Sequence, residues 1–210
     1  MSSNHRKVAL LLVGFLLVFT WSAIRPYNYF VWLLEVLPAI ISIAILFATY
    51  RRFRFTFLVY ALIWLHAIIL VIGGHYTYAE MPLFNWLRDT FDLSRNYYDR
   101  LGHFAQGFVP AIITREILLR KSPLKQGKWL FFLVVCVCLA LSAFYEFIEW
   151  WIALATGTAA TDFLGTQGDI WDTQWDMLFA TCGAVISQLI LGQTHDRALE
   201  RISASKEQVL

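Results

Sequence analysis

The chain carries little charge for its length. Only 15% of its 210 residues are Asp, Glu, Lys or Arg, whereas a soluble domain usually has about 25%. Hydrophobic residues make up 59% of the chain and recur in long runs along its whole length. The composition therefore predicts an integral membrane protein with little room for a soluble domain. The net charge of +2 is small, and the lack of a long basic run argues against nucleic-acid binding.

Cysteine is also scarce, and its positions argue against a disulfide framework. Cys136, Cys138 and Cys182 lie inside apolar segments, and none belongs to a C-x-x-C pair. We interpret them as small residues that face the core or the lipid. The alternation of apolar and polar residues that marks strands is absent as well. Because backbone polar groups must be satisfied inside a bilayer, the apolar segments are predicted to be helices.

Six apolar segments are long enough to cross a bilayer core of about 30 Å, which needs about 20 helical residues. They lie near residues 8–24, 30–50, 55–74, 101–119, 129–154 and 174–193. The predicted fold class is thus all-α: a polytopic membrane protein with six transmembrane helices in a single integral membrane domain over residues 1–210. Between the third and fourth segments, residues 82–87 have the mixed pattern of a helix that lies in the membrane interface.

The basic residues are distributed unequally between the two sides that six crossings would create. Four of the 17 would lie outside, namely Arg25, Arg88, Arg95 and Arg100. The other 13 would lie on the side of the termini: Arg6, Lys7, Arg51, Arg52, Arg54, Arg115, Arg120, Lys121, Lys125, Lys128, Arg197, Arg201 and Lys206. Basic residues are enriched in cytoplasmic loops. This pattern predicts that the N-terminus and the C-terminus are both cytoplasmic.

Polar residues, most of them ionisable, gather at one predicted membrane depth, near the outer face. They are His75, Asp99, His103, Gln106, Glu146, Glu149, Asp169, Asp172 and Asp176. Within each segment the spacing is three, four or seven residues, which places the side chains on one stripe of a helix. Several charges on one stripe would not face lipid, and intramembrane charges usually mark a functional site. We therefore expect the stripes to converge on an intramembrane His/Asp/Glu site that opens toward the periplasm.

The residue types in this site suit acid–base chemistry or a divalent metal such as zinc, manganese or magnesium. The candidate metal ligands are His75, His103, Glu149 and Asp172. The candidate catalytic groups are His103, Glu146, Glu149 and Asp176. The candidate substrate-binding groups are Asp99, Gln106, Gln167 and Asp169. A metal would explain how so many carboxylates tolerate each other without lysines, and the loop over residues 156–173 could close over the site.

Two other interpretations of the same residues stay open. The carboxylates could relay protons or hold a cation in transit, as in a small transporter of a cation, a proton or a solute. They could also form an interhelical hydrogen-bond network that only fixes packing, as in a structural envelope-assembly factor. A transport path predicts polar residues that continue to the cytoplasmic end. There Arg115 and Glu116 are the main polar residues, and we expect them to pair with each other or to snorkel.

Three motifs carry a resemblance to a known family. They are YYDRLGHFAQG at 97–107, YEFIEW at 145–150 and QGDxxDTQxDM at 167–177. With them the chain resembles the YjdF family of bacterial inner-membrane proteins, which implies a multi-pass protein of the inner membrane rather than a reaction. The order of Asp99, His103, an intramembrane Glu and Asp172 or Asp176 is also distantly similar to VanZ-like membrane proteins, with Arg100 in place of their usual lysine. That similarity implies a role in the cell envelope.

The function that this sequence favours is a metal-assisted hydrolase or transferase that acts on a lipid-linked or other envelope substrate. A polar site on one side only fits an enzyme better than a path through the membrane. The expected partners are the lipid bilayer and a lipid-linked or small-molecule substrate.

Overall fold

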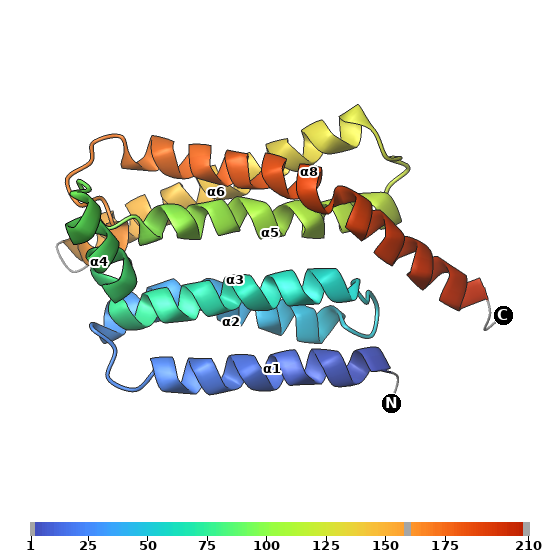
Figure 1. Ribbon diagram of the computed structural model, residues 1–210, viewed down its shortest axis with the longest axis horizontal. Coiled ribbons are helices and arrows are strands. Elements are labelled where there is room, and N and C mark those ends of the chain that lie inside the picture. Colours follow the sequence, from blue (N-terminus) through green and yellow to red (C-terminus); the bar gives the residue numbers. More distant parts are fainter. Residues whose placement is uncertain (1–2, 158–160, 208–210) are drawn as a thin grey trace.

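The regular elements of the protein are helices throughout the residues that the computed structural model describes, which are 3–157 and 161–207 (Figure 1). They are α1 Ser3–Ser22, α2 Tyr29–Thr49, α3 Phe57–Tyr76, the 3-10 helix η1 Tyr78–Glu80, α4 Pro82–Phe91, α5 Tyr98–Lys121, α6 Lys128–Thr156, α7 Thr161–Leu164 and α8 Asp172–Glu207. The all-α prediction is confirmed for this part of the chain. The predicted interfacial helix is present as α4.

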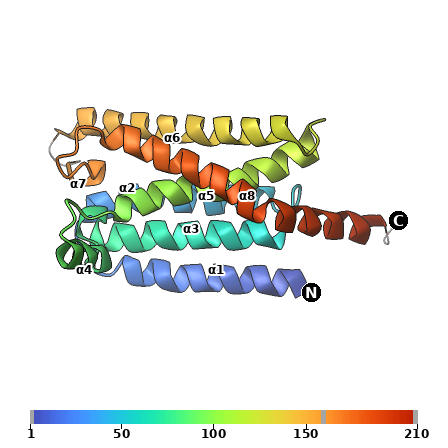
Figure 2. The same ribbon diagram turned by 45° about the horizontal axis from the view of Figure 1, so that its top comes forward.

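The long helices lie roughly parallel in two groups (Figures 1 and 2). One group consists of α1, α2 and α3, and the other of α5, α6 and α8; α3 packs against α5 where the groups meet. Both termini lie at one end of the molecule, which we call the terminal end, and α4 crosses the other end, which we call the α4 end. The loops at the α4 end connect the two groups.

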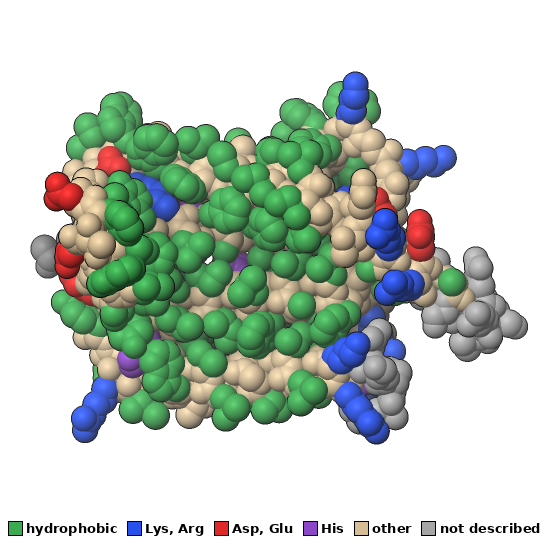
Figure 3. Space-filling model, in the orientation of Figure 1, with side chains coloured by type: hydrophobic (Ala, Val, Ile, Leu, Met, Phe, Trp, Pro, Cys, Tyr) green, Lys and Arg blue, Asp and Glu red, His purple; other side chains and the backbone are tan. Residues whose placement is uncertain are grey.

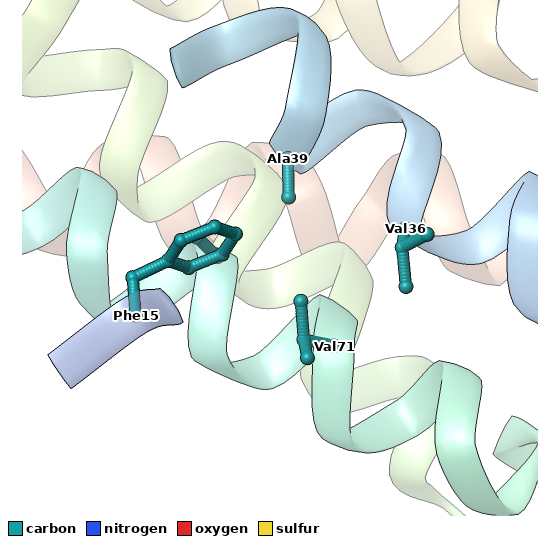
Figure 4. Packing of buried hydrophobic residues seen from close by; sticks show 5 residues of the cluster. Phe15, Val36, Ala39 and Val71 are labelled. Carbon is teal, nitrogen blue, oxygen red and sulfur yellow. The ribbon is translucent and has the colours of Figure 1, made fainter. Parts of the chain in front are cut away.

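Each group has its own apolar core. In the first, Phe15 of α1, Val36 and Ala39 of α2 and Val71 of α3 pack together (Figure 4). In the second, a cluster lies between α5, α6 and α8: Ala111, Leu130, Val134, Cys138 and Ala184. A third cluster joins α3 to α5: Val59, Leu62, Val109 and Ile112. These clusters fix the relative positions of the helices that carry the polar site.

The contact between α5 and α8 is a contact between backbones. A Cβ atom on Gly107 would lie 1.7 Å from the carbonyl oxygen of Ala180, and one on Gly183 would lie 2.1 Å from that of Phe104. Small residues allow such close approach between membrane helices. The middle of the α5–α8 interface therefore has no room for side chains or for a solute.

Five helices are long and apolar enough to cross a membrane: α1, α2, α3, α6 and α8. The sixth predicted segment, α5, lies among them but contains charged residues near both of its ends. The predicted boundaries agree with the helices within a few residues except in α8, which continues to Glu207 instead of ending near 193. Nothing in this stretch interrupts a helix, because it lacks proline and Gly192 keeps a helical conformation.

The surface also has the character of a membrane protein. In Figure 3 hydrophobic side chains cover most of the body of the molecule, and Lys and Arg side chains gather mainly at the terminal end. Large apolar residues such as Phe47, Leu10 and Leu189 expose 86%, 70% and 70% of their surface. Contiguous exposed apolar surface of this kind is expected where lipid tails contact the protein.

Candidate functional site

A cluster of buried ionisable side chains lies between α5, α6 and α8 near the α4 end. Asp99 and His103 are one turn apart at the start of α5, and Asp172 and Asp176 are one turn apart at the start of α8. Glu146 and Glu149 come from the last third of α6. All six side chains are buried. The structure thus brings together most of the residues that the spacing placed on convergent stripes.

Two arginines form the outer layer of this cluster. Arg95 Nη1 lies 2.5 Å from Asp172 Oδ1, and Arg95 Nη2 lies 3.4 Å from Asp99 Oδ2. Arg100 Nη2 lies 2.5 Å from the same Asp172 oxygen and 3.3 Å from Asp169 Oδ2, and Arg100 Nη1 donates to Asp176 Oδ1. Both guanidinium groups are buried. They supply charge compensation that the sequence interpretation had assigned to a metal.

From the sequence, Arg95 and Arg100 count as charges on the outer side, and the predicted site does not include them. Their closeness in sequence to Asp99, four residues before it and directly after it, is a signal that could have identified them. Arg95, in the loop before α5, pairs with Asp99 in the first turn of that helix, and Arg100 reaches across to α8.

An inner layer centres on His103, which faces carboxylates with both ring nitrogens. Its Nε2 lies 3.5 Å from Asp99 Oδ1 and 3.6 Å from Asp176 Oδ1. Its Nδ1 lies 3.8 Å from Glu146 Oε1. Each of these last two atoms is buried without a hydrogen-bond partner among the described residues. One potential ligand atom from each of Asp99, His103 and Asp176 lies within 4.8 Å of the others, so these three could hold a metal ion.

Two further glutamates contribute negative charge to the inner layer. Glu149 of α6 interacts electrostatically with Glu146 and His103. Glu35 of α2 interacts electrostatically with Asp99 and His103 and is also buried. No spacing rule links α2 to the other helices, so only the tertiary packing could identify Glu35.

Tyr78 supports Glu35 from the 3-10 helix at the α4 end. It interacts electrostatically with the Glu35 carboxylate, and its ring occupies the space that a Cβ on Gly73 would fill, at 2.2 Å. Burial, and then the negative charge of Glu35, raise the pKa of Tyr78 well above its ordinary value. The hydroxyl therefore stays protonated and can donate a hydrogen bond.

The loop before α8 is tied to the segment before α5, and this contact covers the site. Gln167 Oε1 accepts from the Asn96 amide and Gln167 Nε2 donates to the Asn96 carbonyl, both at 2.9 Å. Arg95 donates to the carbonyl oxygens of Gly165 and Thr166. Gly165 has φ +63° and lies against Asp99, so this position favours glycine. Gln167, which the sequence predicts to contact a substrate, instead holds the loop before α8 against Asn96.

The remaining predicted site residues lie at the edge of the cluster or away from it. Asp169 is partly exposed beside Arg100 and accepts from the Trp171 amide. Gln106 is half-buried on the His103 stripe and makes no side-chain hydrogen bond within the described residues. His75 Nδ1 lies 3.0 Å from the Ser22 carbonyl oxygen, and its ring lies 4.3 Å from that of Trp21. The structure therefore attaches His75 to α1 and does not bring it to His103.

A second buried polar cluster lies at the terminal end of the same two helices. Glu116 accepts from the Thr56 hydroxyl at 2.7 Å and lies 3.0 Å from His195 Nε2, while Arg115 pairs with Asp196 at 2.6 Å. The expectation that Arg115 and Glu116 pair with each other is wrong, because adjacent residues on a helix point in different directions. His195 was missed because it lies in the part of α8 beyond the predicted span.

Comparisons with known proteins agree with this description. Residues 7–197 match the family described as "Predicted membrane protein (DUF2238)". The chain is 51% identical over 185 residues to inner membrane protein YjdF of Escherichia coli (strain K12), covering 88% of each chain. No solved structure matches. The resemblance to the YjdF family is thus confirmed, whereas the similarity to VanZ-like proteins is not shown and stays a prediction.

Proposed function

The chain belongs to the DUF2238 family of membrane proteins, and on that premise we propose a six-span protein of the bacterial inner membrane with both termini in the cytoplasm. The name of its Escherichia coli relative supports the location. The packing of α5 among apolar helices supports a sixth span, since its charged residues before the last turn are buried in the two polar clusters rather than turned to lipid. The excess of Lys and Arg at the terminal end supports the orientation. The His103 cluster then opens toward the periplasm.

For this cluster we propose that it binds a divalent cation and supports hydrolysis or group transfer on a lipid-linked or other envelope substrate. The observation that carries the proposal is the unpartnered pair of His103 Nδ1 and Glu146 Oε1. Their separation of 3.8 Å is too long for a hydrogen bond. Ligand atoms bound to one ion at about 2.1 Å lie about 3.0 Å apart at adjacent octahedral positions and about 3.5 Å apart in a tetrahedral site, so an ion would draw this pair slightly closer together. Buried polar atoms without partners are rare in native proteins, and a bound ion would satisfy both of these atoms.

The balance of charge leads to the same proposal. The carboxylates of the cluster are Glu35, Asp99, Glu146, Glu149, Asp169, Asp172 and Asp176. Among the carboxylates, the two arginines pair only with the aspartates, so His103 is left as the one basic group beside the three glutamates in the described residues. Buried charge without compensation is costly. The inner layer therefore takes up protons or a cation.

The donor set also selects among metals. With His75 away from the cluster, one imidazole and several carboxylates remain, and such oxygen-rich sites suit Mn²⁺ or Mg²⁺ better than Zn²⁺. The ion would be held by His103 Nδ1 and Glu146, while Asp99 and Asp176 face the other ring nitrogen, and it would polarise a substrate oxygen. Glu149, which makes no ion pair with an arginine in the described residues, would serve as the acid or base.

A transporter of a cation or a proton is the second candidate, because the Glu116–His195 cluster supplies the polar groups at the opposite end that a path would need. The two clusters are separated along α5 by 12 or 13 residues, about 18 Å. Between the two clusters, at Gly107 and Gly183, the backbones of α5 and α8 are in direct contact. Because this contact closes the His103 cluster toward the terminal end, an enzyme is favoured over a transporter.

The first experiment is elemental analysis of the full-length protein purified in detergent without chelators. We expect close to one Mn²⁺ or Mg²⁺ per chain, and at least a tenfold loss of the ion in His103→Ala and Glu146→Gln. Glu200→Gln, an exposed glutamate at the terminal end, is the matched control and should retain the ion. Circular dichroism and size-exclusion chromatography would verify that each variant is folded and monodisperse.

The outcomes separate the three functions. An ion that is absent from the parent, or that persists in both variants, would overturn the metal-assisted mechanism. Uptake of Mn²⁺ into proteoliposomes that contain the parent but not Glu146→Gln would overturn the enzyme in favour of a transporter. If the parent binds no ion and the variants lose only thermal stability, the cluster would be a structural hydrogen-bond network.

A further inference from the structure

A cavity with a basic lining lies at the terminal end, on the opposite side of the molecule from the His103 cluster. Its volume is about 680 Å³, and it is bounded by the start of α1, the loop between α2 and α3, and the end of α8. The basic residues in its lining are His5, Lys7, Arg51, Arg52, Arg54, Arg120 and Arg201. No acidic residue belongs to this lining within the described part of the chain. The cavity is therefore suited to an anion.

Most of these cations have no acidic partner. Arg120 donates hydrogen bonds to Glu116 and to the Arg54 carbonyl oxygen, and the Arg54 guanidinium lies over the ring of Tyr50. Arg51, Arg52 and Arg201 are exposed, and none of them forms an ion pair within the described residues. Several unpaired cations around one cavity repel one another, and a bound anion would relieve that repulsion.

An apolar groove of about 600 Å³ continues from this cavity along α1, α2 and α3. The two spaces share His5, Val8, Tyr50, Arg51 and Tyr60 in their linings. Beyond these shared residues the groove is lined mainly by apolar side chains, among them Leu12, Phe15, Ile43, Phe47 and Ile63. From Tyr60 to Ala67 it follows α3 for about 10 Å. A basic mouth joined to an apolar groove matches a ligand with an anionic head and a hydrocarbon tail.

Trp64 lines the groove one turn along α3 from Tyr60, about 6 Å deeper than the cavity. Its indole Nε1 is buried against Gly14 of α1, so the groove presents an acyl chain with an apolar ring at this depth.

We propose that the cavity and the groove together form a binding site for one anionic phospholipid, with its phosphate head among Arg51, Arg52 and Lys7 and an acyl chain along α1 and α3. Basic pockets between membrane helices are known to select anionic headgroups. The assignment does not depend on the function of the His103 cluster, since it uses none of the same residues.

Native mass spectrometry of the full-length protein in detergent tests this site. The probes are phosphatidylglycerol and phosphatidylcholine with identical acyl chains. We expect selective retention of phosphatidylglycerol and about a thirtyfold loss of that affinity in the double variant Arg51→Gln/Arg52→Gln. The matched control is Arg6→Gln/Arg197→Gln, which removes the same charge from exposed positions at the same end that do not line the cavity. The control should bind as the parent does.

Three results would overturn the site. They are equal retention of the two lipids by the parent, an equal loss of affinity in the control double variant, and displacement of phosphatidylglycerol by inorganic phosphate alone. The last result would indicate a site for a soluble anion.

Discussion

At the scale of single residues, the arginines of the outer layer decide whether the site can be buried at all. Arg100 reaches Asp99, Asp169, Asp172 and Asp176 from one guanidinium group. A planar group with five donors can satisfy several carboxylates, which a lysine ammonium cannot do in the same geometry. The outer layer therefore requires arginine rather than positive charge alone.

Arg100→Gln should lower the stability of the protein by about 3–5 kcal/mol, because it leaves buried aspartates without a counter-charge. A thermal or denaturant unfolding experiment in detergent would measure this loss. Arg88→Gln, at a half-exposed pair with Asp89, should change stability by less than about 1 kcal/mol.

The double variant Arg100→Gln/Asp176→Asn should recover part of that stability, since it removes one of the orphaned charges. A double variant that is less stable than Arg100→Gln would show that Asp176 does not depend on Arg100, contrary to the contact between them.

At the scale of the elements, the two polar clusters are held in place by the glycine contacts of α5 and α8. Both helices begin at the His103 cluster and continue through the Glu116–His195 cluster, so their separation sets the geometry of both. Gly107 and Gly183 fix this separation because any larger side chain would meet backbone atoms of the other helix.

Gly107→Ala should therefore destabilise the protein by about 1–3 kcal/mol or more, as overpacking forces the helices apart. Gly192→Ala on the same helix pair is the matched control, because its added Cβ would meet no atom within 4 Å. It should be neutral or stabilising by up to about 1 kcal/mol through helix propensity. Parallel melting curves would check both, and an equal effect of the two substitutions would contradict the close contact.

The elements also show how far the sequence could predict the site. Hydrophobic runs and the spacing of Asp99, His103 and Asp176 identified the helices and the convergence of their polar stripes, because both signals are periodic within one helix. The position of Glu35 and the set of aspartates around Arg100 depend on how different helices pack. His75 enters the predicted site only because of its predicted depth in the membrane. Depth places a residue along the membrane normal but does not say which neighbouring helix it faces.

At the scale of the whole molecule, charge is separated between the two ends. The α4 end carries the aspartate cluster with its arginines buried, whereas the terminal end carries several exposed basic residues, among them Arg51, Arg52 and Arg201, that form no ion pair within the described residues. This asymmetry supports the proposed orientation with the terminal end in the cytoplasm.

Labelling of introduced cysteines would test this orientation in a background in which Cys136, Cys138 and Cys182 are replaced. A membrane-impermeant maleimide added to spheroplasts should modify Arg88→Cys at once and Arg197→Cys only after the membrane is permeabilised. Both positions carry exposed or half-exposed side chains, so detergent should make their labelling equal. The opposite order of labelling would reverse the proposed topology.

The pairing of Arg100 with Asp172 has a consequence for biosynthesis. The two residues are 72 positions apart in the chain, so at about 5–20 residues per second the partner of Arg100 is made several seconds after α5. During that interval α5 and the loop before it would hold Arg95, Asp99 and Arg100 without the aspartates of α8, a costly state in hydrocarbon. If α5 is the sixth span that we propose, we expect it to settle into the bilayer only once the last helix arrives, and a chain whose synthesis stops before α8 to stay incompletely inserted.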